Sequence, residues 1–222
     1  MKLIILLLSL FICLAGCNFD LTPTFYVRDI QDVISDKQEI EIPIFVKLPS
    51  SDVDSCQAEI GQVLGILETY QIKGTLQSCS SDEVGMFAFA NVKFTASLVW
   101  SEGQTPNNFS GIVALAVEQT SRQEHYLSLY ANPKLPSALD DIENALFFAT
   151  LDASQVGFEI TLNNDTRQEF VINIYDSFVN GVPTDYGTFQ VGPRSELQVR
   201  SSNVLSHLFF NRGWFTIGDF EI

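Results

Sequence analysis

Side chains that could carry acid–base or metal chemistry are few in this sequence and widely spaced. The two histidines, His125 and His207, stand outside any H-E-x-x-H or comparable metal-binding pattern. Adjacent carboxylates occur at 82–83 and 140–141, and such pairs act as acid and base where their surroundings separate their pKa values. The motifs of serine hydrolases, P-loops and dinucleotide-binding loops are missing from the sequence. We therefore predict no catalytic residue, no metal site and no cofactor.

The N-terminus has the composition of a secretory signal. A single basic residue, Lys2, precedes an apolar run over 3–14, and the small residues Ala15 and Gly16 follow it. About a dozen apolar residues are too few to cross a bilayer core, which takes about 20 helical residues. A cleaved signal peptide is therefore favoured over a retained membrane span.

The end of this run, Leu14-Ala15-Gly16-Cys17, resembles the bacterial lipobox, in which an aliphatic and two small residues precede a cysteine. The resemblance implies a signal peptide over 1–16, a diacylglycerol on the sulfur of Cys17 and a short tether over 17–23. The alternative is an ordinary signal peptide with a chance cysteine. Two or three acyl chains anchor a protein stably, because each buried methylene contributes about 0.8 kcal/mol.

The residue after the lipidated cysteine bears on the membrane in which the anchor lies. In lipoproteins of bacteria with two membranes, aspartate at this position favours retention in the inner membrane. The chain has Asn18 there, so the resemblance implies a place in the outer membrane.

Two cysteines remain for other chemistry. Cys13 lies in the segment to be cleaved and Cys17 would be acylated, which leaves Cys56 and Cys79. In the oxidising compartment of an exported protein an isolated pair tends to form a disulfide. The pair has neither the C-x-x-C spacing of redox proteins nor nearby ligands for zinc. We predict a Cys56–Cys79 disulfide.

Composition indicates a folded, acidic protein. Hydrophobic residues make up 46% and charged residues 18% of the 222 residues, and the net charge is −15. The apolar content suffices for a packed core. The acidic charge opposes binding to nucleic acid and to anionic lipid headgroups. Solubility alone is favoured as the reason for this charge over a specific basic partner.

Residues 24–150 predict an α+β module built on an antiparallel sheet with two helices. Apolar residues recur every three or four positions between Val53 and Tyr70, which predicts a helix with Cys56 on its buried face. A second helix is predicted from Pro136 to about Ala149. Strands are predicted over 24–27, 39–48, 72–78, 86–100, 111–118 and 124–130. Pro43 restricts the second of these to a sheet edge or a bulge.

Residues 151–222 predict a small all-β sandwich, for which the Ig-like fold is an architectural analogy. Apolar residues alternate over 158–162 and 170–174, and Asn180-Gly181 is a hairpin signal. Further short strands are predicted over 188–191, 196–200, 203–210 and 213–217.

The aromatic end of this module supplies the candidate binding surface. Phe209-Phe210 and Trp214-Phe215 are adjacent pairs, and in a strand such neighbours point to opposite faces. One member of each pair therefore needs a cover other than the sandwich core. Packing against the α+β module is the favoured cover, and a protein partner or the membrane surface is the alternative that would make these residues a binding surface.

The start of the mature chain, Leu21–Val33, resembles a group of uncharacterised lipoproteins of proteobacteria and their phages. The resemblance implies no catalytic residues. We expect a non-enzymatic binding or adaptor protein, anchored by acyl chains on Cys17, with a protein partner in the cell envelope and no nucleic acid. The alternatives are a prophage-encoded lipoprotein that blocks a surface receptor and, least favoured, an envelope hydrolase.

Overall fold

The computed structural model describes residues 19–81, 88–103, 105–106, 108–121, 124–145 and 156–221. The predicted signal peptide, Cys17 and the predicted module boundary at 150–151 lie outside these residues. In chain order the elements are β1 (Phe19–Leu21), β2 (Thr24–Tyr26), α2 (Val27–Asp36), β3 (Ile40–Ser50), α3 (Val53–Thr69), β4 (Gly74–Ser81), β5 (Ala88–Ser101), β6 (Val113–Ser121), β7 (Glu124–Ala131), α4 (Leu135–Ala145), β8 (Val156–Asn163), β9 (Phe170–Val179), β10 (Val182–Val191), β11 (Glu196–Ser201), α5 (Asn203–Arg212) and β12 (Trp214–Glu221).

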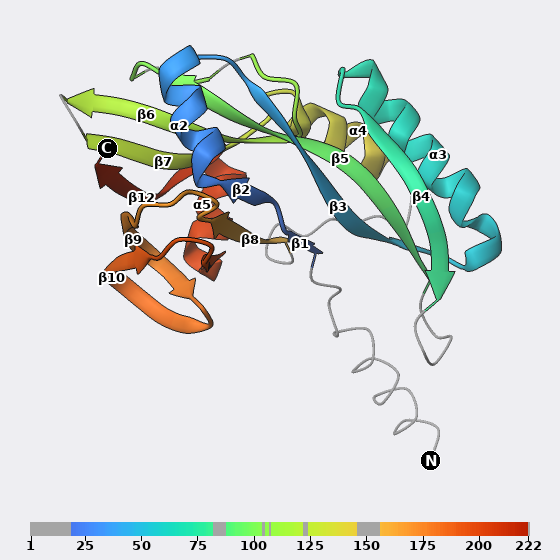
Figure 1. The fold of residues 1–222 in the computed structure, drawn as a ribbon. Helices are drawn as coiled ribbons and strands as arrows, with labels where there is room; N and C mark the ends of the chain where they lie inside the picture. The colour runs from blue at the N-terminus through green and yellow to red at the C-terminus, as the bar shows by residue number, and fades with distance from the viewer. Residues whose placement is uncertain are drawn as a thin grey trace.

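All the described strands belong to one mixed, 12-stranded sheet, in the order β1-β8-β11-β9-β12-β7-β6-β5-β3, with β10, β2 and β4 paired to β9, β8 and β5 (Figure 1). Strands from the two halves of the chain pair with each other at two places in it: β1 and β2 run parallel to β8, and β12 lies between β7 and β9. The predicted fold class, an antiparallel N-terminal sheet followed by a separate sandwich, is therefore wrong. Apolar alternation identifies strands but does not specify their partners, which is why the error arose.

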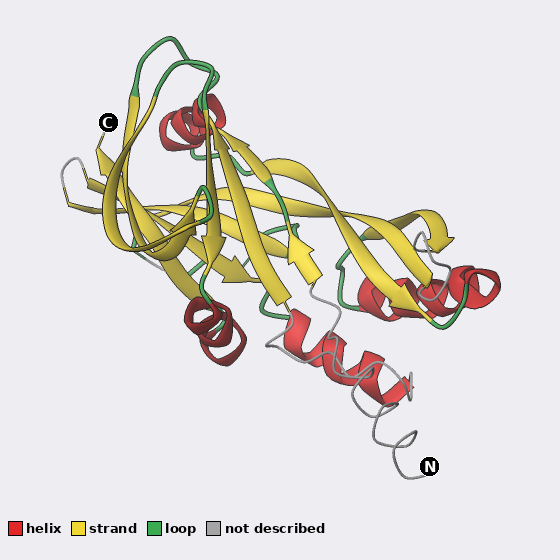
Figure 2. Ribbon diagram, turned by 90° about the horizontal axis from the view of Figure 1, so that it is seen from below, coloured by secondary structure: helices red, strands yellow, loops and turns green. Residues whose placement is uncertain are grey.

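The sheet curves around a single large core (Figure 2). β1, at one end of the strand order, lies close to β3 at the other end. The buried residues of α2, α3, α4 and α5 all join this core, together with alternate residues of the strands. A smaller cluster on the opposite side of β5, β6 and β7 contains Val99, Phe109, Ala114, Ala116 and Tyr130. The described helices thus pack on one face of the sheet.

Two helices were not predicted from the sequence. The buried side of α2 consists of Val27, Ile30 and Val33. The helix begins at Val27, which was predicted to be the last residue of a strand. α5 occupies the whole of the predicted strand over 203–210. At its start the Ser202 hydroxyl accepts a hydrogen bond from the backbone N–H of Leu205. Gly213 ends α5 at φ 80°, a left-handed conformation that glycine adopts without steric cost.

Several local predictions are confirmed. α3 spans Val53–Thr69, and the Asp52 carboxylate caps its start by accepting from the backbone N–H of Ser55 at 2.7 Å. Cys56 on its buried face forms a disulfide with Cys79 of β4. β3, with Pro43, lies at one end of the strand order. The Asn180-Gly181 turn joins β9 to β10, with Val179 opposite Val182.

The close packing of β12 between its neighbours requires a glycine. The register against β7 shifts between Thr216 and Gly218, and a Cβ added to Gly218 would overlap the carbonyl oxygen of Asn173. Among the described helices, none is both long and apolar enough to cross a membrane.

Candidate functional site

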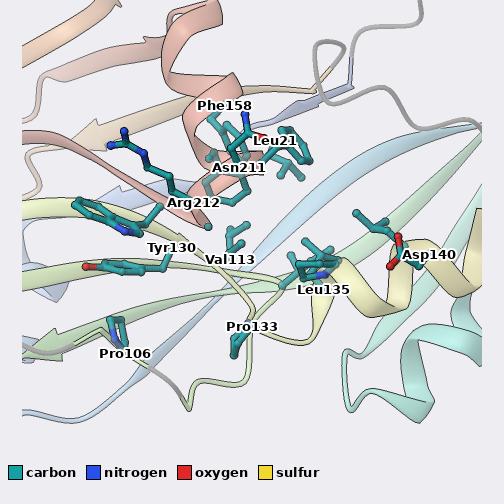
Figure 3. Close-up of a pocket in the computed structure, with 18 of the residues that line it drawn as sticks. Leu21, Pro106, Val113, Tyr130, Pro133, Leu135, Asp140, Phe158, Asn211 and Arg212 are labelled. Atoms are coloured by element: carbon teal, nitrogen blue, oxygen red, sulfur yellow. The ribbon is translucent and has the colours of Figure 1, made fainter.

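An apolar cavity of about 620 Å³ opens where several strands end (Figure 3). Leu21 of β1 and Val46 of β3 form part of its wall. Ala131 and Leu135 line it from the two ends of the connection between β7 and α4. The end of α5 and the start of β12 supply a further wall. A volume of this size lies in the usual range of ligand pockets, roughly 300–1,000 Å³.

The aromatic wall contains three of the four residues predicted as a binding surface. Phe209, Phe210 and Trp214 line the cavity, as does Phe158 of β8. Phe209 is only 2% exposed and lies 4.4 Å from Phe158 between ring centroids. Phe215 is 4% exposed and packs behind the wall, with its centroid 6.1 Å from those of Phe158 and Phe209.

Two of the four predicted surface residues are buried and two are accessible. The reason is not the alternation of a strand, because the first pair lies on a helix. Phe209 and Phe210 are neighbours on a helix, so their side chains diverge by about 100° and do not point to opposite faces. Phe210 is half-buried and Trp214 is 40% exposed. These two are the accessible members, while Phe209 and Phe215 belong mainly to the core.

Trp214 is held in place by Tyr130 of β7. The two rings stack with centroids 5.9 Å apart and planes 19° from parallel. The Tyr130 hydroxyl donates a hydrogen bond to Oε1 of Glu118 at 2.5 Å. The pKa of Tyr130 is raised, mainly by burial and further by this hydrogen bond and the charge of the carboxylate. The hydroxyl therefore stays protonated and continues to donate at neutral pH.

Charged side chains lie at the rim of the cavity. Arg212, at the end of α5, and Asp140, on α4, are on opposite sides of it (Figure 3). Glu143 lies one turn further along α4. Within the described part of the chain no histidine, cysteine or serine lines the cavity. Its walls provide an apolar surface for burying a ligand, with charges where the ligand would emerge.

A second, polar cavity of about 540 Å³ borders the same connection between β7 and α4. Glu39 accepts hydrogen bonds there from the hydroxyls of Ser97 and Ser110, at 2.5 and 2.7 Å. Burial alone would raise the pKa of Glu39, but the hydrogen bonds outweigh it and hold the pKa below its ordinary value. These bonds tie the chain before β3 to β5 and to the chain before β6, which is a structural role.

The other sequence candidates do not converge on a site. His125 is 5% exposed and lies between the rings of Trp100 and Phe220, with its Nδ1 atom without a hydrogen-bond partner. His207 is exposed on α5. The carboxylate of Asp141 accepts from the Tyr70 hydroxyl at 2.6 Å, and residues 82–83 lie outside the described structure. In the ranges the structure covers, no three His, Cys, Asp or Glu side chains are grouped to hold a metal ion.

Sequence reasoning missed the cavity because its walls come from distant parts of the chain. Leu21, Val46 and Leu135 each read as ordinary apolar residues of a strand or helix. The local signals were Ser202 and Gly213, whose types favour a helix start and a helix end and would have indicated α5 before β12.

Comparison with family models gives one match: a model described as a domain of unknown function (DUF7424) matches residues 19–221. Comparison with curated proteins and with solved structures finds no match.

Proposed function

Because the chain belongs to the DUF7424 family of domains of unknown function, we propose a function from its own structure and sequence. The protein is a non-enzymatic binding protein of the cell envelope, anchored by acyl chains on Cys17 and placed in the outer membrane. Its cavity takes up the acyl chain of a lipid.

The observation that carries this proposal is the chemistry of the cavity wall. A saturated chain offers no hydrogen-bonding groups, so it requires walls that present none. Leu21, Val46, Leu135 and Phe158 provide such walls. Burying apolar surface contributes about 25 cal/mol per Å², and a chain of many methylenes would gain most of its affinity in this way. The charged rim suits a polar headgroup that remains in water.

The position of the cavity along the chain supports a lipid ligand. Leu21 lines the cavity and follows Cys17 by four positions. Four residues span at most about 14 Å when fully extended. An anchor on Cys17 would therefore keep the cavity close to the lipid surface from which a chain could enter.

Tryptophan fluorescence offers a direct test, because the chain has two tryptophans and Trp214 lines the cavity. A brominated fatty acid should quench Trp214 saturably in a Cys17→Ser, Trp100→Phe protein, which cannot be acylated at residue 17. The matched Cys17→Ser, Trp214→Phe protein reports from Trp100, which does not line the cavity, and should show little quenching. Equal quenching in both proteins would refute binding in the cavity.

Filling the cavity should weaken this binding. Ala131→Leu adds three carbons to a side chain that lines it, and each methylene of ligand that is displaced costs about 0.8 kcal/mol. Loss of two methylenes of contact corresponds to an affinity about tenfold lower. The quenching titration measures the change. Ala145→Leu, the same substitution at an exposed position outside the cavity, is the control and should bind as the parent does.

The anchor has a separate test. Cys17→Ser should shift the protein from the membrane fraction to the soluble envelope fraction, because no acyl chain can attach to serine through a thioether. Fractionation after a high-salt wash measures the shift. A serine variant that remains with the membranes would contradict lipid attachment at Cys17 but would leave the cavity proposal to its own experiment.

A further inference from the structure

The face of the sheet opposite the core carries a row of acidic and aromatic side chains. Glu118, Tyr126 and Asp219 lie directly opposite one another on β6, β7 and β12, and the row continues through Asn173 of β9 to Thr188 of β10. Residues directly opposite in adjacent strands share one face. These five strands lie side by side, on the left of Figure 1.

Three further aromatic side chains join this row. Tyr130 is four residues from Tyr126 on β7, Tyr175 is two residues from Asn173 on β9, and Tyr186 lies opposite Tyr175. We call Glu118, Tyr126, Tyr130, Tyr175, Tyr186 and Asp219 the tyrosine face. Leu127 and Leu129 of the same strand β7 point into the large core instead, as alternation requires. The described helices all pack on that core side, so none of them covers the tyrosine face.

Tyrosine hydroxyls fix the carboxylates of this face. Tyr130 donates to Glu118 at 2.5 Å. Asp219 accepts from the Tyr175 hydroxyl and, at 2.8 Å, from Nδ2 of Asn173. A carboxylate has about four acceptor sites on its two oxygens, so the bond from Tyr130 orients the half-buried Glu118 and leaves it capacity for a ligand. Asp219 is 6% exposed, and its bonds hold Asn173 and Tyr175 in place. The rings of Tyr175 and Tyr186 stack 5.7 Å apart, and Tyr186 is 64% exposed.

The charge of this region has one sign. Strands β6, β7, β9, β10 and β12 contain no lysine or arginine within their bounds. Their acidic residues are Glu118, Glu124, Asp176, Asp185, Asp219 and Glu221. Aromatic rings next to fixed carboxylates suit arginine, because its planar guanidinium can pair with a carboxylate and stack on a ring at the same time.

We propose that the tyrosine face binds an arginine-bearing segment of a partner protein. Glu118 pairs with one of its guanidinium groups. The exposed ring of Tyr186, which follows the exposed carboxylate of Asp185 in the chain, stacks on another. Charge decides among the possible occupants. Nucleic acid and anionic lipid headgroups are repelled by a face without basic residues. A second copy placed across a two-fold axis would set acidic residues against acidic residues.

The probes that test this proposal are two fluorescent peptides of equal length, one with alternating arginine and serine and one with lysine in place of arginine. Fluorescence anisotropy with the full-length protein should show binding that weakens as salt rises, with the arginine peptide bound at least threefold more tightly. Equal affinity for the two peptides, or no binding, would overturn recognition by this face.

Matched variants locate the site. Glu118→Gln and Tyr186→Ala together should weaken binding of the arginine peptide at least tenfold. Glu68→Gln, the same charge change at an exposed position on α3, should change it less than twofold. Circular dichroism confirms that each variant is folded, and Tyr186→Ala alone, at a 64% exposed side chain, provides a variant that removes no buried side chain. An equal loss in Glu68→Gln would show non-specific attraction to an acidic protein and would refute the proposal.

Discussion

Truncation of Phe215 to alanine should lower the free energy of unfolding by about 3–5 kcal/mol, the usual cost of removing a buried phenylalanine ring. Phe215 is 4% exposed, and its ring packs against Phe158 and Phe209, which join it from β8 and α5. The alanine variant would leave a cavity between these elements, because the sheet and α5 can close it only in part. Urea denaturation followed by circular dichroism measures the loss.

The neighbouring residue provides the control. Trp214→Ala removes a larger ring from a position that is 40% exposed, so less apolar surface loses its burial and no enclosed cavity forms. We expect well under half of the loss seen for Phe215→Ala. A larger loss at Trp214 than at Phe215 would contradict the assignment of Phe215 to the core and Trp214 to the cavity rim.

The disulfide should contribute nearly as much. Cys56 and Cys79 are 23 residues apart and join α3 to β4. In the chain-entropy model a cross-link that closes a loop of this length stabilises the fold by about 3 kcal/mol, because it restricts the unfolded chain. Cys56→Ala with Cys79→Ala should therefore lower the urea midpoint, and a reductant should lower that of the parent protein to a similar extent.

The double variant is also the control for the reductant. With neither Cys56 nor Cys79 present, its urea midpoint should not change when reductant is added. If the parent protein and the double variant unfold at the same urea concentration under oxidising conditions, the bridge does not stabilise the fold.

Local sequence determined the elements whose signals agree with one another. The apolar spacing between Val53 and Tyr70 and the caps in front of it predict α3, and Asn180-Gly181 predicts the β9–β10 hairpin. Pro43 predicts an edge because proline has no N–H to donate to a second neighbour. The Cys56–Cys79 pairing followed from elimination and compartment, without knowledge of the fold.

Signals were in conflict at α5. Val204, Phe209 and Phe210 are residue types enriched in strands, and they predicted a strand. Ser202 and Gly213 are typical of a helix start and a helix end, and the structure follows them. A helix here places Phe209 against Phe158 of β8. This long-range contact favours the helix, and it cannot be read from the local sequence.

The sequence by itself determined the acidic charge, the disulfide and the elements whose residues form a local pattern, and the anchor on Cys17 is a prediction from the sequence alone. Tertiary structure alone decided that β8 pairs with β1 and β2, that β12 lies between β7 and β9, and that the cavity and the tyrosine face exist. The physical reason is that alternation fixes which face of a strand is apolar, whereas the neighbour of each strand depends on how side chains from distant segments fill one common core. The cavity and the tyrosine face each require such neighbours, so neither could be inferred from any single stretch of the chain.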